Sequence, residues 1–403
     1  MIIEKNIQTY KTSVSQIFIV ILMLMICFRI IIDLTGYLGE ESGNLNFGAI
    51  YSVLFLCISF LLVVHKWVNK GVSISDVLIF SIIIGYIIAF IYNGIFPGSS
   101  TSLFRFLTGF IAFNLLFYSD LKGKSIKYIK LFFILLLVPI IISWLQYIGL
   151  YPFTFYDWVN GSEFGRPSGG YFQPSSLTRL LIFGCILIYI IDYSTKFKVH
   201  YKLSLLSLLL ATCFISGHRT SLLIMLILIL FYELHQIKKF LGFLLKSLPL
   251  IIPIILLATF LLREKIESYL IIYSELLNIS NNGNLEVRGR GEIWGNAADI
   301  LSNEYDPIQL IFGYGYPIIE AHNDILRIIL VNGIWGLFLN IFLLIFVYKF
   351  VSKKVNKPGR IILNGTYIYL FLFSIPLHPT EYPNFLWLFT FTLIILINIF
   401  RKS

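Results

Sequence analysis

Apolar runs of roughly twenty residues recur along the whole chain, and short polar segments separate them. Each run is long enough to cross a hydrocarbon core of about 30 Å as an α-helix. Long strand-like alternation is absent and a spanning segment must pair its own backbone groups, so we expect a helical bundle. The expected spans are 14–34, 48–65, 74–96, 101–119, 129–150, 176–193, 203–217, 219–235, 242–262, 323–349, 361–379 and 383–400.

The composition supports this interpretation. Of the 403 residues, 58% are hydrophobic and only 13% are charged, whereas soluble domains carry about 25% charged residues. The mean hydropathy is +0.84. We therefore predict an all-α integral membrane protein in which residues 1–403 form one polytopic domain. The first run, Val14–Leu34, lacks a small-residue cleavage site and is expected to be a signal anchor.

The net charge of +10 is distributed unevenly between alternate loops. Lysines gather in one set, at Lys66 and Lys70 and within 122–130, 196–202, 238–246 and 349–360, whereas the other set holds Glu40, Glu41, Asp157 and Glu163. This is the positive-inside pattern, which explains the charge without a nucleic-acid partner. It predicts cytoplasmic termini and an even number of spans, twelve.

Two outer loops are long. One covers 151–175, and the other covers 263–322, before the tenth span. Long ordered loops are usually functional, so the second is expected to form part of an active site. It contains two candidate helices, Glu264–Ile279 and Glu292–Ser302, and the segment Ile311-Phe-Gly-Tyr-Gly-Tyr316.

Basic residues on the outer side are mostly arginine, in contrast to the inner lysines. They are Arg166, Arg179, Arg219, Arg263, Arg288, Arg290 and Arg327, with Lys265 the only lysine. The guanidinium fork matches phosphate or carboxylate in two-point contact, which indicates a planar anionic ligand. The alternative is that these arginines anchor helix ends to lipid headgroups.

His322 stands where the long loop enters a span, in Glu320-Ala-His-Asn-Asp-Ile325. Asn323 or Asp324 can cap that helix, and Gly333 and Gly336 return to the histidine's face and allow close helix approach. A helix N-terminus attracts phosphate and disfavours an imidazolium, so a neutral histidine here is a candidate general base. Alternatively, it only caps the helix or bonds a loop carbonyl.

Two arginines could complete such a site by clamping a diphosphate. Arg219 lies in the tight turn Ser216-Gly-His-Arg-Thr-Ser221, where a charge near hydrocarbon needs a partner or a task. Arg290 lies one helical turn before Trp294, and Arg166 is a third candidate. Arg29 and Asp33 are expected to form an intrahelical ion pair.

A metal site is not expected. His65, His200 and His235 lie beside inner lysines, whereas His218, His322 and His378 lie near the outer face, and none has metal-ligand spacing. The cysteines, Cys27, Cys57, Cys185 and Cys213, lie inside apolar runs at unrelated spacings and are expected to be packing residues.

Together these segments resemble the O-antigen polymerase and O-antigen ligase superfamily of bacterial membrane glycosyltransferases. His322-Asn323, nine residues and Gly333-Ile-Trp-Gly336 are similar to the family's histidine signature. Ser216-Gly-His-Arg-Thr-Ser-Leu-Leu223 is similar to its outer arginine turn, although His218 stands where small or polar residues are common, which leaves its participation open. Arg290-Gly-Glu-Ile-Trp294 with Gly313-Tyr-Gly315, and Arg166-Pro-Ser-Gly-Gly-Tyr-Phe-Gln-Pro174, are similar to two further motifs.

The resemblance implies a GT-C-like fold in the bacterial plasma membrane, with an active site facing the periplasm or exterior and no cofactor or metal. Donor and acceptor would be oligosaccharide repeat units on undecaprenyl diphosphate. His322 would be the base, and Arg219, Arg290 and Arg166 would hold the diphosphate. Asn323, Asp324, Arg288, Gly333, Gly336 and His218 would support them. Membrane lipids would surround the chain, and a chain-length regulator protein is a further partner that it allows.

Three other functions stay open. The first is a ligase, which shares these motifs but transfers the glycan to lipid A-core; polymerase is favoured because His-Asn-Asp-Ile-Leu-Arg327 is closer to polymerases. The second is a lipid-linked oligosaccharide transporter, which would need ionisable residues around a central cavity. The expected spans hold few besides Arg29, Asp33 and Arg105. The third is a nonenzymatic assembly scaffold.

Overall fold

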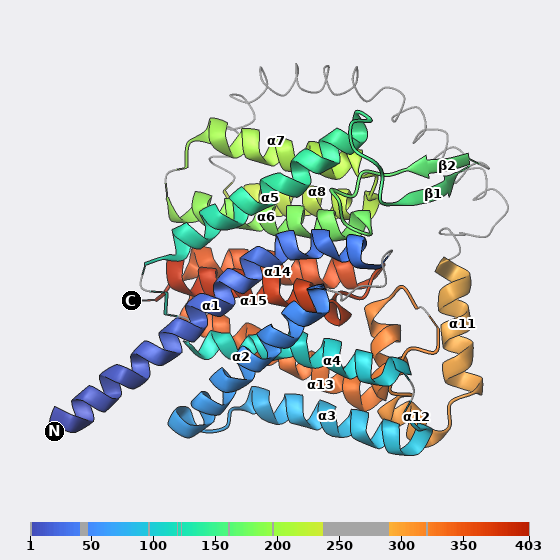
Figure 1. Ribbon diagram of the computed structural model, residues 1–403, viewed down its shortest axis with the longest axis horizontal. Coiled ribbons are helices and arrows are strands. Elements are labelled where there is room, and N and C mark those ends of the chain that lie inside the picture. Colours follow the sequence, from blue (N-terminus) through green and yellow to red (C-terminus); the bar gives the residue numbers. More distant parts are fainter. Residues whose placement is uncertain are drawn as a thin grey trace.

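A computed structural model describes residues 2–40, 47–95, 97–118, 120–121, 123–159, 162–195, 197–236, 290–319 and 321–402 (Figure 1). Its helices are α1 (Ile2–Glu40), α2 (Phe47–Lys70), α3 (Ile74–Asn93), α4 (Pro97–Phe110) with the 3₁₀ helix η1 (Ile111–Tyr118), α5 (Ser125–Tyr147), α6 (Pro174–Ser194), α7 (Val199–Ile215), α8 (Arg219–Leu234), α11 (Arg290–Asn303), α12 (Pro307–Phe312), α13 (Asp324–Lys354), α14 (Lys357–Ser374), the 3₁₀ helix η2 (Pro379–Glu381) and α15 (Pro383–Ile399). Two short strands, β1 (Tyr156–Val159) and β2 (Ser162–Gly165), pair antiparallel.

Seven helical segments in the described part of the chain are long and apolar enough to cross a membrane. They are Ser15–Leu34, Phe47–Lys70, Ile74–Asn93, Ser100–Tyr118, Ser125–Tyr147, Pro174–Ser194 and Asp324–Lys354, and two shorter apolar helices are Val199–Ile215 and Pro383–Ile399. The chain is therefore an all-α membrane protein, as predicted. Each expected span overlaps a helix except 242–262, which lies outside the described residues together with the candidate helix Glu264–Ile279. The count of twelve stays a prediction.

Two helices, α6 and α15, form the centre of the bundle. Nearly every side chain is buried from Leu177 to Ile190 in α6 and from Phe385 to Ile397 in α15. Both sequences are apolar on all sides, so neither has a polar face to turn toward water. The two helices pack on each other, and α15 also packs against α1, α4, η1 and α14.

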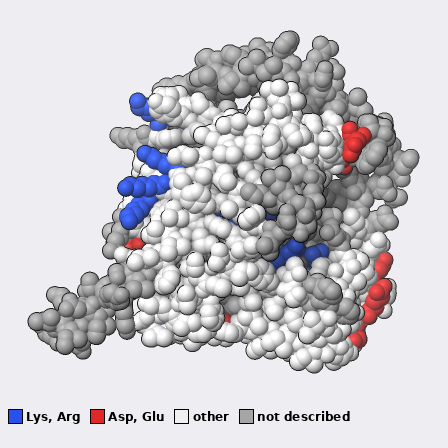
Figure 2. All heavy atoms as spheres, viewed as in Figure 1, with Lys and Arg blue, Asp and Glu red and all other residues white. Residues whose placement is uncertain are grey.

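The two ends of the bundle differ in structure and in charge. The β1–β2 hairpin, α11 and α12 lie at one end, which we call the hairpin end, and the C-terminal residues lie at the opposite end (Figure 1). Lys and Arg gather on the surface toward that opposite end, the basic end, and Asp and Glu gather toward the hairpin end (Figure 2). The separation agrees with the charge alternation between loops in the sequence.

The hairpin was not predicted. Its partners run from Tyr156 opposite Gly165 to Val159 opposite Ser162, so two residues, Asn160 and Gly161, connect the strands. Asn-Gly between short strands is a strong hairpin signal.

The expectation of few ionisable groups in the spans was wrong, because several lie inside the helices, where they are buried and paired.

One buried pair lies near the basic end of α2 and α3. The Lys66 ammonium is 2.6 Å from the Asp76 carboxylate, and the two side chains are only 1% and 2% exposed. Lys66 also donates to Asn114. A second group joins Lys202 of α7 to Asp192 of α6 and to Glu233 of α8. Lys66 and Lys202, expected in short loops between spans, instead join helices within the bundle.

Candidate functional site

His322 has an unusual backbone. With φ 45° it is the only non-glycine residue of positive φ in the described part of the chain, a conformation that histidine adopts more readily than β-branched residues do. Asn323 directly after it caps α13: its side-chain oxygen accepts from the Leu326 amide at 3.1 Å, and its amide nitrogen donates to the Ile375 carbonyl at 3.0 Å. The cap fixes the start of α13 directly after His322, whose side chain is half-buried.

Asp324 is a support of a different kind from the one expected. Its carboxylate is 3% exposed and accepts hydrogen bonds from Thr380 at 2.6 Å and Ser374 at 3.3 Å. A carboxylate in the first turn balances the positive end of the helix dipole. The start of α13 therefore already has a negative charge beside it.

A short series of rings connects His322 to Arg179. The His322 and His378 rings are nearly parallel, with centroids 6.4 Å apart. His378 Nε2 lies 3.1 Å from the Tyr382 hydroxyl, and the Arg179 guanidinium lies over the Tyr382 ring at 4.2 Å. Arg179 itself is 5% exposed, donates to the Ser175 carbonyl and the Ser176 hydroxyl, and has a buried Nη1 without a hydrogen-bond partner.

Arg219 lies at the first position of α8, after a turn as tight as the sequence predicts. His218 Nδ1 lies 2.7 Å from the Ser221 hydroxyl, so this histidine braces the turn. Arg166, directly after β2, donates from Nη2 to the Gly217 carbonyl at 2.7 Å and from Nε to the Ser216 carbonyl at 3.3 Å. The arrangement gives Arg166 a positioning role toward the turn that carries Arg219.

The two groups meet through α6. The Ser221 hydroxyl lies 2.8 Å from the hydroxyl of Thr178, the neighbour of Arg179 along the chain. A continuous series of contacts thus runs from His322 through His378, Tyr382 and α6 to the Arg219 turn. Residues about one hundred positions apart in the sequence share one network of side chains.

Gly333 breaks α13 two to three turns below His322. Its φ of 65° and ψ of −173° are not helical, and the break leaves the carbonyls of Leu330 and Val331 without their usual partners in the helix. Tyr314 and Gly315 donate to these carbonyls from their amides, each at 2.9 Å. A Cβ on Gly333 would lie 2.1 Å from the Ile311 carbonyl oxygen.

Gly333 and Gly336 were expected to lie on one helix face and to let a neighbouring helix approach closely. The two glycines instead have different surroundings. Gly333 admits the backbone of α12 and the following loop, whereas a Cβ on Gly336 would meet the side chain of Asn332 in the same helix. The loop segment and the histidine helix form one unit. Tyr305 strengthens it by donating from its hydroxyl to the Leu330 carbonyl at 2.8 Å.

Arg290 lies at the first position of α11, where a helix was predicted over Glu292–Ser302; its side chain and Arg288 lie outside what the structure describes. Along α11, Ala297 is fully buried in a cluster with Ala321 and Leu330, and Leu301 packs against it. The helix thus packs against the first turns of α13, which follow His322.

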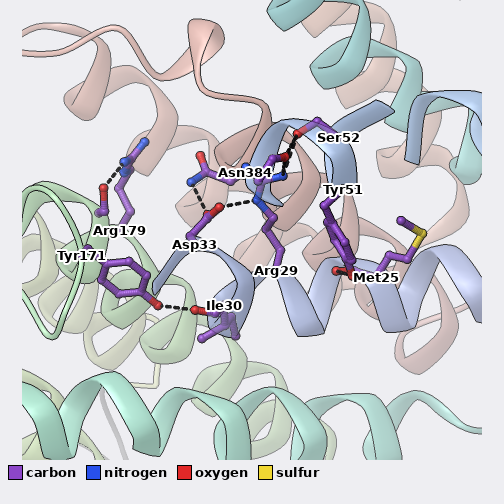
Figure 3. A network of polar contacts seen from close by, with 11 residues as sticks. Met25, Arg29, Ile30, Asp33, Tyr51, Ser52, Tyr171, Arg179 and Asn384 are labelled. Carbon is purple, nitrogen blue, oxygen red and sulfur yellow. Dashed lines mark hydrogen bonds and ion pairs between the residues drawn. The ribbon is translucent and has the colours of Figure 1, made fainter. Parts of the chain in front are cut away.

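A polar network lies next to these groups, between α1, α2, α6 and α15 (Figure 3). Arg29 and Asp33 form the expected ion pair at 2.5 Å, and Asn384 donates to the second Asp33 oxygen at 3.0 Å. These three side chains line a cavity of about 20 Å³ together with Arg179, which is room for about one water molecule. Burial raises the pKa of Tyr171 well above its usual value, so its phenol stays protonated and donates to the Ile30 carbonyl.

The sequence alone does not single out several members of this site. Arg179 is one of several outer arginines, and no motif marks His378, Tyr382 and Asn384. They belong to His378-Pro-Thr-Glu-Tyr-Pro-Asn384, a polar segment between two apolar runs, and its composition is the signal that could have marked it. Within the described residues, no group of three or more His, Cys, Asp or Glu could hold a metal ion.

No model of a protein family matches the chain, and the comparison with curated proteins gave no match either. The fold and the composition define a helical membrane protein with a histidine–arginine network at its hairpin end.

Proposed function

We propose that this protein is a membrane glycosyltransferase that polymerises oligosaccharide repeat units carried on undecaprenyl diphosphate. The observation that supports the proposal best is the contact series from His322 to the Arg219 turn. It joins a candidate base with candidate phosphate ligands at the ends of the helices, as a reaction on a membrane-anchored diphosphate requires. The motifs that resemble the O-antigen polymerase and ligase superfamily are the ones that supply these residues.

The proposed topology follows from the charges. The basic end faces the cytoplasm with both termini, twelve spans cross the bacterial plasma membrane, and the hairpin end faces the periplasm or exterior. The loop 263–322 lies on that outer face, in a GT-C-like arrangement. Nucleotide sugars are confined to the cytoplasm, which is why a lipid-linked donor fits this side.

In the proposed reaction His322 accepts the proton of an acceptor sugar hydroxyl as its oxygen attacks the anomeric carbon of the donor. The new carbon–oxygen bond forms while the bond to the diphosphate breaks, so the anomeric configuration inverts. Arg219 and Arg290 stabilise the negative charge that grows on the departing diphosphate. Arg166 keeps the Arg219 turn in place through the Ser216 and Gly217 carbonyls.

The deciding experiment uses purified protein in nanodiscs, with undecaprenyl-diphosphate-linked repeat units as the only glycan substrate. A ladder of products that disappears in His322→Ala and persists in His200→Ala, a histidine of the basic end, supports the polymerase. Transfer only after lipid A-core is added identifies a ligase instead. Neither product, with an active positive control, rejects both and favours the transporter, which the protein reconstituted in sealed vesicles can test as movement of the lipid-linked glycan between leaflets.

A further inference from the structure

A cavity of about 440 Å³ opens at the basic end, within the range of about 300–1,000 Å³ that is typical of small-ligand sites. Five basic side chains line it: Lys70, Lys353, Lys354, Arg401 and Lys402. They come from the end of α2, the end of α13 and the segment after α15. The cavity is separate from the histidine–arginine network, which lies at the other end of α13.

Backbone pairing brings four of these cations together. The segment after α15 forms an antiparallel bridge between Arg401 and Val355. The Lys402 amide donates to the Lys354 carbonyl at 2.9 Å, and the Asn356 amide donates to the Phe400 carbonyl at 2.9 Å. This pairing fixes Arg401 and Lys402 beside the end of α13, so the cations converge because the backbone holds them there.

The described part of the chain gives none of these five cations an ion-pair partner. Asp120 also lines the cavity. Lys70 lies over the Tyr118 ring and donates to the Phe117 carbonyl, and Lys354 lies over the Phe350 ring. Like charges at short range repel, and an anion with several oxygens would relieve that repulsion.

The position of the cavity identifies the source of such an anion. Four candidate spans begin or end at its lining, at Ser15, Lys70, Tyr118 and Lys354. The cavity therefore lies where the hydrocarbon core meets water, at the depth of lipid headgroups. Ile19, Phe117 and Ile397 add an apolar wall, which suits the glycerol and acyl chains of a lipid and offers nothing to a free phosphate ion.

We propose that this cavity binds the phosphate of an anionic phospholipid from the leaflet at the basic end. Basic pockets between transmembrane helices bind phosphate headgroups in this way. The inference does not depend on the glycosyltransferase proposal, because it uses other residues at the other end of the bundle.

The test uses the full chain, delipidated in neutral detergent, and native mass spectrometry with short-chain phosphatidylglycerol, short-chain phosphatidylcholine or inorganic phosphate as probes. The variant Lys354→Gln/Arg401→Gln removes two charges from the cavity. The matched control, Lys198→Gln/Lys349→Gln, removes two exposed lysines that do not line it. We expect phosphatidylglycerol binding to weaken by roughly tenfold or more in the cavity variant and by less than about twofold in the control, with phosphatidylcholine binding weak throughout.

A second cavity variant, Lys353→Gln/Lys402→Gln, changes two exposed side chains and is expected to weaken binding similarly while thermal unfolding stays at the parent midpoint. Equal losses in the cavity and control variants would mean that diffuse surface charge holds the lipid, and the proposal fails. It also fails if the parent does not retain phosphatidylglycerol. If inorganic phosphate displaces the lipid at similar concentration, the site belongs to a free phosphate ion.

Discussion

The substitution Gly333→Ala tests whether the break in α13 is needed. The φ of 65° and ψ of −173° at this residue lie in a region that is essentially restricted to glycine. The added methyl would also lie 2.1 Å from the Ile311 carbonyl oxygen and 2.3 Å from its carbon. Because these are backbone atoms, no side-chain rotation relieves the clash, and α12 must move away.

The size of the effect follows from two terms. A non-glycine residue in such a conformation costs about 1–3 kcal/mol. Displacing the loop removes the hydrogen bonds from the Tyr314 and Gly315 amides, each of which contributes roughly 1 kcal/mol. We therefore expect the free energy of unfolding to fall by about 3–5 kcal/mol. Under the proposed function, polymer formation should fall by about tenfold or more, because misplacement of the proposed base by about 1 Å can lower a rate by up to about a hundredfold.

The assay is equilibrium unfolding in mixed micelles of sodium dodecyl sulfate and neutral detergent, followed by the polymer ladder. Gly295→Ala is the matched control, since a Cβ there meets nothing within 4 Å and alanine favours the helix by about 1 kcal/mol over glycine. Equal stability and activity in the two variants would refute the view that the break at Gly333 positions the loop and His322.

Other predictions concern separate parts of the chain. Lys66→Met leaves the buried Asp76 carboxylate without its ammonium partner and should lower the free energy of unfolding by about 3–5 kcal/mol. The double variant Lys66→Met/Asp76→Asn should recover most of this loss, and no recovery would contradict the account. Arg166→Lys retains the charge but loses the hydrogen bonds to the Ser216 and Gly217 carbonyls, so the free energy of unfolding should fall by about 1–3 kcal/mol. If unfolding and polymer formation are both unchanged, Arg166 does not position the turn. Hydrogen bonds from the Tyr92 hydroxyl and two backbone amides lower the pKa of Asp306, so the stability that this carboxylate contributes is complete above the unfolded pKa of about 4 and is lost as the pH falls through the folded pKa. In acid unfolding curves the stability difference between the parent and Asp306→Asn should therefore shrink over that pH range, and a constant difference would argue against this account of Asp306.

Much of the fold was predictable because apolar run length is a strong signal in a membrane protein. The spans 48–65, 74–96 and 129–150 correspond to α2, α3 and α5 with boundaries shifted by a few residues. Lys66 was misassigned for a physical reason. Its position at the end of an apolar run is compatible with a loop lysine, and only the turn that joins α2 to α3 brings Asp76 to it.

The candidate site was predictable where the chemistry is local. Asn323 follows His322 directly, so the cap could be read from neighbouring residues, and the tight turn before Arg219 follows from its sequence. The contacts of His378 and Arg179 could not, because the rings and cations that meet there come from α6, α13 and the segment before α15. The break at Gly333 is not visible in the sequence because it depends on another element: the Ile311 carbonyl lies where a Cβ on Gly333 would stand.

The buried position of α15 has a consequence for biosynthesis. This helix is translated after all the other described helices, yet it lies in the middle of the bundle: Trp387 stacks on Phe55 with ring centroids 3.7 Å apart and donates to the Thr108 carbonyl at 2.7 Å. Until α15 enters, the earlier helices must cover those apolar surfaces with lipid or with each other. The bundle therefore reaches its final packing only when α15, the later of its two central helices, has left the ribosome, although α6 is already in place.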